Sequence, residues 1–184
     1  MNSHPDLYLL RHGQTEWNRQ GRLQGLLDLP LTPLGIRQAQ RQADIVADIL
    51  SRNRDLALYC SPLGRARLSA AIAFGGREPV LDSRLVEIDV GAAAGQAWPG
   101  AATAQSRCVW YDSLPGGERV AALRARVRAF LDDLTGPAMI MTHGVTLCML
   151  RMVATGLPDA ALDDLEMKQG AVHVVTNRRF SLID

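Results

Sequence analysis

The stretch LYLLRHGQTEWN, residues 7–18, decides the fold, because a short apolar run passes directly into a cation, an imidazole and a glycine. Residues 7–10 have the length and composition of a buried β-strand. A turn that only redirects the chain uses Gly13 but has no need of Arg11 or His12. The stretch therefore predicts a strand that presents functional side chains at its carboxyl end.

The same arrangement returns late in the chain, where the apolar residues 138–142 lead into His143-Gly144. In open α/β sheets, ligands bind in a crevice beyond the carboxyl ends of the strands. We therefore expect His12 and His143 at one edge of the sheet. Gly13 and Gly144 are expected to let backbone N–H groups approach a ligand there.

Strand and helix patterns alternate along the rest of the chain. The sequence predicts strands at 7–10, 56–60, 138–142, 171–176 and 179–183, and helices at 34–50, from Ser61-Pro62 to Gly75-Gly76, from Gly117 to about Leu134, and at 145–155. Thr32 and Ser61, each followed by a proline, are predicted to cap the first two of these helices. Residues 14–31 are expected to be irregular and 77–116 to form a connecting segment. This order predicts a single α/β domain over residues 1–184, with three α/β/α layers and a mostly parallel central sheet flanked by helices.

Composition excludes several classes of protein. The formal net charge is +1, from 20 basic and 19 acidic residues, whereas nucleic-acid-binding proteins show a basic excess or stripe. No apolar run approaches the roughly 20 residues of a membrane span. The three cysteines show no disulfide or metal-site spacing. We expect a cytoplasmic protein that binds neither nucleic acid nor membrane, while the oligomeric state stays open.

Two arginines and two histidines are expected to converge on an anion. Arg65 lies in the first turn of the helix that follows Ser61-Pro62, at the same edge as Arg11, and helix N-termini favour anions. Arginine matches phosphate oxygens with two parallel hydrogen bonds, and a neutral imidazole is a competent nucleophile near pH 7. No Walker A loop or metal-binding motif is present in the sequence. The pattern predicts phosphoryl transfer through a phosphohistidine, with no cofactor and no metal.

Six segments in fixed order carry a family resemblance: LLRHGQTEWN, LQGLLDLPLTPLGIRQA, CSPLGRA, LVEIDVG, PGGE and THGV. They resemble the histidine phosphatase superfamily, the phosphoglycerate-mutase-like proteins, and in length its compact phosphatase branch. The resemblance runs from Leu7 to about Pro158. It implies a phosphoglycerate-mutase-like fold and a small phosphorylated metabolite as the partner.

The resemblance also implies a role for individual residues. His12 would be the nucleophile, and Glu87 the acid and base that protonates the leaving oxygen and later activates water. The remaining implied site residues are those that hold the phosphoryl oxygens, Arg11, Arg65 and His143, a further donor, Asn18, and the pocket mouth, Gln24 and Gly25. The chain departs from the family at Ala93 and Ala94, where Trp and Glu are common.

Other interpretations of these residues stay open. Asp89, Asp112 and Glu118 are rivals of Glu87 for the acid/base role, with solvated surface carboxylates as the simpler interpretation. The arginines of RVAALRARVRAF, residues 119–130, are expected on the wet face of a helix. The leading function is a phosphomonoesterase acting on a sugar phosphate or ribazole phosphate. Its alternatives are a cofactor-dependent phosphoglycerate mutase and a phosphoryl-binding regulator without turnover.

Overall fold

The computed structural model describes residues 4–53, 55–100 and 105–184. These residues contain one six-stranded sheet with the strand order β3-β2-β4-β1-β5-β6. The strands are β1 (Leu7–Arg11), β2 (Ala57–Cys60), β3 (Val80–Leu81), β4 (Ala138–Thr142), β5 (Val172–Thr176) and β6 (Arg179–Ile183). The pairings β3–β2, β2–β4 and β4–β1 are parallel, and β1–β5 and β5–β6 are antiparallel. The expected mostly parallel sheet is confirmed.

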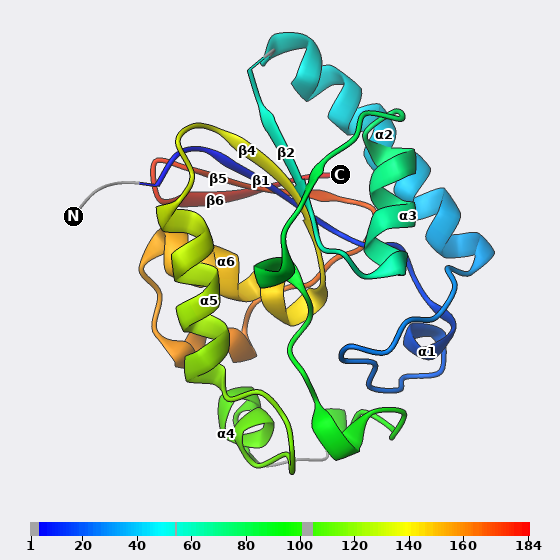
Figure 1. The fold of residues 1–184 in the computed structure, drawn as a ribbon, viewed down its shortest axis with the longest axis vertical. Helices are drawn as coiled ribbons and strands as arrows, with labels where there is room; N and C mark the ends of the chain where they lie inside the picture. The colour runs from blue at the N-terminus through cyan, green and yellow to red at the C-terminus, as the bar shows by residue number, and fades with distance from the viewer. Residues whose placement is uncertain (1–3, 54, 101–104) are drawn as a thin grey trace.

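Helices cover both faces of the sheet (Figure 1). The helices α2 (Pro33–Arg52) and α3 (Gly64–Ala73) pack on one face, and α5 (Val120–Asp132) and α6 (Gly144–Thr155) on the other. Successive residues of β1 point to opposite faces, so Leu9 enters the α5–α6 core and Leu10 the α2–α3 core. The three-layer α/β/α architecture is therefore confirmed.

Helix α2 begins as the sequence predicts. The Thr32 hydroxyl accepts a hydrogen bond from the N–H of Gly35 at 3.1 Å, and Pro33 occupies the first helical position, where its missing N–H is harmless. No helix in the described part of the chain is both long enough and apolar enough to cross a membrane.

The start of α3 differs from the prediction. Ser61-Pro62 does not cap the helix, which begins at Gly64 after an N-cap residue without a side-chain hydrogen bond. Instead the carboxylate of Asp28 accepts from the N–H groups of Gly64 and Arg65. The prediction was wrong because the cap comes from a residue distant in sequence, which a local pattern cannot reveal.

Short elements lie inside the segments expected to lack regular structure. They are α1 (Glu16–Arg19), β3, α4 (Arg107–Asp112) and the 3₁₀ turns Ser83–Leu85 and Gly91–Ala93, and a further 3₁₀ turn, Asp159–Asp163, follows α6. Helix α1 has a capping box, in which Thr15 and Asn18 each accept from the other's backbone N–H. Elements this short show no clear period, so sequence patterns miss them. Residues 101–104 of the connecting segment lie outside the described residues.

The loop after β1 and the first turn of α2 are in backbone contact. A Cβ atom on Gly13 would lie 2.1 Å from the carbonyl oxygen of Gly35, and a Cβ on Gly35 would lie 2.2 Å from that of Gln14. Both glycines are therefore required by close approach of two backbones, and any side chain there would push α2 away from the loop.

We expect Gly35→Ala to lower the free energy of unfolding by about 3 kcal/mol, because the added methyl group meets backbone that cannot move independently. Urea denaturation measures the change. Gly136→Ala is the matched control, since a Cβ there meets nothing within 4 Å, and it should alter stability by less than about 1 kcal/mol. Equal effects of the two substitutions would contradict the packing argument.

Candidate active site

The two histidines meet because β1 and β4 are neighbours in the sheet. The register pairs Arg11 with Thr142, and the N–H of His12 donates to the carbonyl of Thr142 at 3.0 Å. The next residue on each strand is a histidine, and the two imidazole centroids lie 5.1 Å apart. Parallel pairing thus unites residues 12 and 143, as predicted.

The backbone from Arg11 to Gln14 is held at every residue by a side chain. The contacts are Gln42 Nε2 to Arg11 O at 3.1 Å, Gln169 Nε2 to His12 O at 2.9 Å, Gly13 N to Ser69 Oγ at 3.0 Å, and Gln14 N to Gln38 Oε1 at 2.7 Å. The loop that carries His12 is therefore preorganised before any ligand arrives.

Gly13 does not have the expected role. Its N–H is occupied by Ser69, and it faces α2 and does not line the pocket. The glycine is needed for the contact with Gly35, so the expectation of a backbone donor at this position was wrong. Gly144 does line the pocket, where a Cβ would lie 3.4 Å from the guanidinium carbon of Arg11.

His12 has a defined tautomer. Its Nδ1 lies 2.7 Å from the carbonyl oxygen of Gly13, which can only accept, so Nδ1 carries the proton. The lone pair is then on Nε2, which lies 3.3 Å from Nε of Arg65. The unprotonated nitrogen of His12 is therefore the one that faces a guanidinium.

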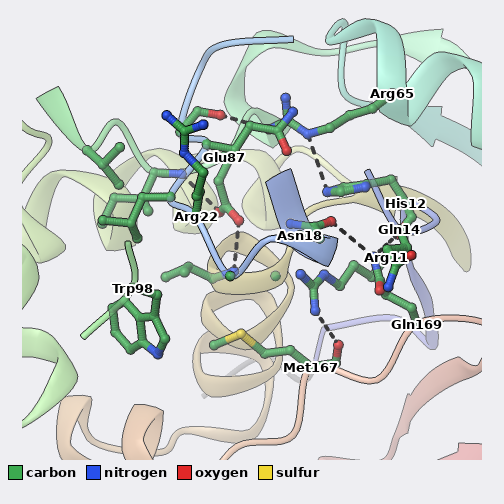
Figure 2. Close-up of a pocket in the computed structure, with 18 of the residues that line it drawn as sticks. Arg11, His12, Gln14, Asn18, Arg22, Arg65, Glu87, Trp98, Met167 and Gln169 are labelled. Atoms are coloured by element: carbon green, nitrogen blue, oxygen red, sulfur yellow. Dashed lines mark hydrogen bonds between the residues drawn. The ribbon is translucent and has the colours of Figure 1, made fainter. Parts of the chain in front are cut away.

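Arg65 links both histidines and is fixed by the loop before α2. Its Nε–H is shared between Nε2 of His12 and Nδ1 of His143, at 3.3 and 3.2 Å. Its Nη1 and Nη2 donate to the carbonyls of Leu27 and Gly25, both at 2.7 Å. Figure 2 shows the Arg65 side chain reaching towards His12 in the pocket that both residues line.

His143 is in the opposite tautomer to His12. Because its Nδ1 accepts from Arg65, its proton is on Nε2, which lies 2.7 Å from the hydroxyl oxygen of Ser61. Ser61, predicted as a helix cap, thus orients a histidine ring. Protonation of Nδ1 would turn His143 into a donor towards an anion placed beside His12.

Arg11 is a half-buried cation on the pocket wall, and one of its donors has no partner. Its Nη1 donates to the carbonyl of Met167 at 2.8 Å, whereas its Nε is buried without a partner. Burial lowers the pKa of Arg11, partly offset by Glu87, but guanidinium stays charged at neutral pH. Arg11 lines the pocket, so an oxyanion bound there would lie beside its guanidinium group.

Both histidines are neutral in this structure. Desolvation, followed by the charges of Arg65 and Arg11, lowers the pKa of His12 well below its ordinary value. Desolvation, followed by Arg65 and His12, has the same effect on the pKa of His143. A neutral His12 retains the lone pair that a nucleophile needs.

Asn18 presents its donor group to the cavity. Its Oδ1 accepts from the N–H of Thr15 at 3.2 Å and from Gln169 Nε2 at 3.4 Å (Figure 2). Both acceptor contacts orient the amide so that Nδ2 is the group left to face the pocket that Asn18 lines. The position agrees with the predicted donor role.

Glu87 enters the pocket from the 84–87 segment and lies against the start of α6. One carboxylate oxygen accepts from the N–H of Val145 at 3.2 Å, and the other from the N–H and hydroxyl of Thr146, both at 3.1 Å. Glu87 therefore lies on the pocket wall, with a fixed orientation beside Gly144 and Val145.

The rival carboxylates have structural partners elsewhere. Asp89 accepts from the N–H of Gly91 at 2.8 Å, and Asp112 from the N–H of Val120 at 2.7 Å. Glu118 forms an ion pair with Arg126 at 2.7 Å. None of the three carboxylates lines the pocket, so Glu87 is the acid/base candidate that the geometry retains.

Arg126 is not simply on the wet face of α5. Its guanidinium donates to the carbonyls of Arg84 and Glu87 while it pairs with Glu118. The side chain thereby fixes the segment that delivers Glu87, aided by the hydroxyl of Thr142, which donates to Leu85 O at 2.8 Å. The expectation that this arginine is merely solvated was wrong.

The cavity has a volume of about 480 Å³ and is lined by Arg11, His12, Asn18, Arg65 and Glu87, whereas the fully buried His143 is not among its lining residues. Gln24 and Gly25 also line the cavity, although the Gln24 amide is occupied by Thr15 and Leu27. Ala93 is buried in the core, and neither Ala93 nor Ala94 lines the cavity. The cavity wall is therefore formed by other residues, and the alanines that replace Trp and Glu do not contribute to it.

Several cavity residues escaped the sequence analysis. Gln169 and Met167 come from the segment before β5, Arg22 from the loop after α1, and Arg107 from α4. Trp98 also lines the cavity, and it packs on Trp110 with ring centroids 4.7 Å apart. No motif marks these positions, because their function depends only on where the chain folds them.

In the described residues, no group of three or more His, Cys, Asp or Glu side chains is placed to hold a metal ion. The positive groups in this pocket are guanidinium groups, and its histidines contact arginine or hydroxyl groups. Such a site, at the carboxyl ends of parallel strands, defines a class of α/β protein that binds a phosphoryl group.

Comparisons with known proteins give the family. The histidine phosphatase superfamily (branch 1) matches residues 7–180, and the chain belongs to this superfamily. A protein of Hydrogenobacter thermophilus named as a phosphoserine phosphatase is 32% identical over 90% of this chain and 86% of its own. A Proteus mirabilis protein named "Probable phosphoglycerate mutase GpmB" is 32% identical over 90% and 82%.

A solved structure supports the fold. The crystal structure of a phosphoglycerate mutase from Thermus thermophilus is 35% identical, with a TM-score of 0.75 over 97% of this chain and 98% of that one. The phosphoglycerate-mutase-like fold implied by the sequence is confirmed. The relatives carry names of both phosphatases and mutases, so the family alone leaves the substrate open.

The buried neutral histidines make stability depend on pH. Their native pKa values lie below the unfolded value of about 6.5, so below that pH the unfolded chain binds protons that the native chain does not. Stability should therefore fall as pH drops from 6.5, by up to about 1.4 kcal/mol per pH unit for each histidine. Urea denaturation between pH 6.5 and 5 measures the slope.

His12→Asn and His143→Asn should each make this slope shallower. The pKa of His173 is also lowered by burial, and that histidine contributes equally to all three proteins. A slope in both variants as steep as in the wild type would show that neither imidazole is neutral in the folded protein.

Proposed function

We propose that this protein is a phosphomonoesterase that hydrolyses a small phosphorylated metabolite through a phosphohistidine on His12, without a metal ion. The observation that carries the proposal is the unprotonated Nε2 of His12, fixed by the Nδ1 contact to Gly13 O and facing the Arg65 guanidinium at 3.3 Å. A nucleophile and the cations for a phosphoryl group are thereby assembled at one point.

In the first step, Nε2 of His12 attacks phosphorus and the bond from phosphorus to the ester oxygen breaks. The leaving oxygen takes a proton from Glu87, which must bind that proton before the reaction. Arg11, Arg65, His143 and Asn18 stabilise the charge on the phosphoryl oxygens. The guanidinium groups supply this stabilisation from fixed positions.

In the second step, water attacks phosphorus, and the bond between phosphorus and Nε2 breaks. Glu87 accepts the proton of the attacking water, so the same carboxyl group returns to its starting state. Inorganic phosphate leaves, and His12 regains its lone pair. The balance requires only water as the second reactant.

The family and the size of the site support a small phosphorylated substrate. A cavity of about 480 Å³ accommodates the phosphoryl group together with a small organic body, such as that of a sugar phosphate or of ribazole phosphate. The arginines Arg22 and Arg107 add positive charge to its wall. We propose a cytoplasmic, single-domain enzyme without a cofactor.

Hydrolysis of p-nitrophenyl phosphate in EDTA tests the chemistry. Wild-type activity should survive chelation, and His12→Ala should lose at least about a thousandfold in kcat/KM, because the nucleophile is absent. Wild-type activity that disappears in EDTA, or His12→Ala that stays active, would contradict the proposed mechanism.

Glu87→Gln tests the acid by the choice of leaving group. With an alkyl phosphate such as glycerol phosphate, kcat/KM should fall about 100-fold to 10,000-fold, because the alkoxide must be protonated. With p-nitrophenyl phosphate the fall should be much smaller, since the phenolate leaves unaided. Glu78→Gln, on an exposed carboxylate, is the control. Equal losses with both substrates would remove Glu87 from this role.

Phosphoglycerate-mutase chemistry is the second candidate, because relatives named as mutases reach 32% identity over most of the chain. A mutase returns the phosphoryl group to an organic acceptor and keeps a durable phosphoenzyme. Labelled phosphoenzyme that persists for minutes in water and is discharged by phosphoglycerate would favour the mutase. Rapid discharge by water alone favours the phosphatase, and no labelling favours a binding protein.

A further inference from the structure

Residues 166–169 run beside the pocket and belong to no helix or strand. We name this segment the strap. Three successive carbonyls of the strap each accept one buried side chain. The contacts are Arg151 Nη1 to Glu166 O at 2.8 Å, Arg11 Nη1 to Met167 O at 2.8 Å, and His173 Nε2 to Lys168 O at 3.1 Å. Side-chain hydrogen bonds thus hold three successive carbonyls of a segment that has no regular secondary structure.

The fourth strap residue reaches the nucleophile. Gln169 Nε2 has two hydrogens, and it donates to the carbonyl of His12 at 2.9 Å and to Oδ1 of Asn18 at 3.4 Å. The first contact fixes the peptide that carries the imidazole. The second turns the Asn18 amide so that its donor, and not its acceptor, faces an anion (Figure 2).

Arg151 explains why the strap stays in place. It comes from α6, is only 4% exposed, and lies over the ring of Phe180 at 3.5 Å. Within the described residues it forms no ion pair, and its Nε has no partner. A buried cation without a carboxylate is costly for stability. The side-chain hydrogen bond that it does form is to the strap.

We propose that the strap is a positioning element of the phosphoryl site, in which Gln169 aligns His12 and Asn18 while Arg151 holds the strap against Arg11. Arg11 is oriented by Met167 O through Nη1, and it lines the pocket in which a phosphoryl group would lie. The proposal rests on the proposed function, because it assigns these residues to the same anion site. Neither Gln169 nor Arg151 touches the reacting atoms, so both act through other residues.

Gln169→Met tests the first part, since methionine has a similar volume but no donor. We expect kcat to fall about tenfold to a hundredfold, because misplaced catalytic groups lose rate steeply. The dissociation constant of inorganic phosphate, measured by calorimetry, should rise about fivefold, the equivalent of one neutral hydrogen bond. Gln40→Met, on the exposed face of α2, is the matched control and should change neither quantity.

Arg151→Met and Arg151→Lys test the second part. The methionine variant loses a buried unpaired cation, so its Tm should stay within about 4 °C of the wild type while kcat falls at least about tenfold. Lysine keeps a donor for Glu166 O and should recover part of the rate. Arg128→Met, at an exposed arginine of α5, is the control.

The outcomes distinguish failure of the strap proposal from failure of the proposed function. If wild type hydrolyses no phosphate ester, the proposed function fails, and the strap is judged by phosphate affinity alone. If wild type is active and both Gln169→Met and Arg151→Met keep its kcat and phosphate affinity, the strap proposal is overturned. Loss of activity in Arg151→Met that follows only a loss of Tm, without rescue by lysine, would also overturn it.

Discussion

The parallel pairing of β1 with β4 is the interaction on which the rest of the site depends. Sequence separates the two strands by more than a hundred residues, yet their register places His12 and His143 side by side at one sheet edge. Arg11 precedes one histidine, and α6 begins directly after the other. A shift of this register by one residue would send each side chain to the opposite face and dismantle the pocket.

Buried positive charge defines the character of the pocket. Arg11 makes no ion pair among the described residues, and Arg65 has only one weak contact, 3.4 Å, with the carboxylate of Asp28. Backbone carbonyls hold both guanidinium groups in place, at Met167, Leu27 and Gly25. Carbonyls orient a cation without cancelling its charge, so the site keeps the attraction that a phosphoryl dianion needs. Desolvation, followed by the field of these arginines, keeps the histidines neutral.

The sequence by itself determined the order of strands and helices, the two strand-end histidines, the Arg65 helix and the cap at Thr32. These features come from local patterns, in which apolar periodicity and cap residues have their effect within one element. The family motifs also singled out Glu87 as the acid/base candidate, whereas residue type alone did not distinguish it from three other carboxylates. The local patterns and motifs together gave a set of residues but not the contacts between them.

Only the tertiary structure decided how those residues are held. The packing of Gly13 on Gly35, the capping of α3 by Asp28, and the contact of Gln169 with His12 join segments that no sequence period connects. The physical reason is that hydrogen bonds between distant segments depend on where the fold brings each backbone group, and unpaired buried groups must be satisfied by whichever side chain lies nearest. The sequence determined which groups exist, and the fold decided which of them meet.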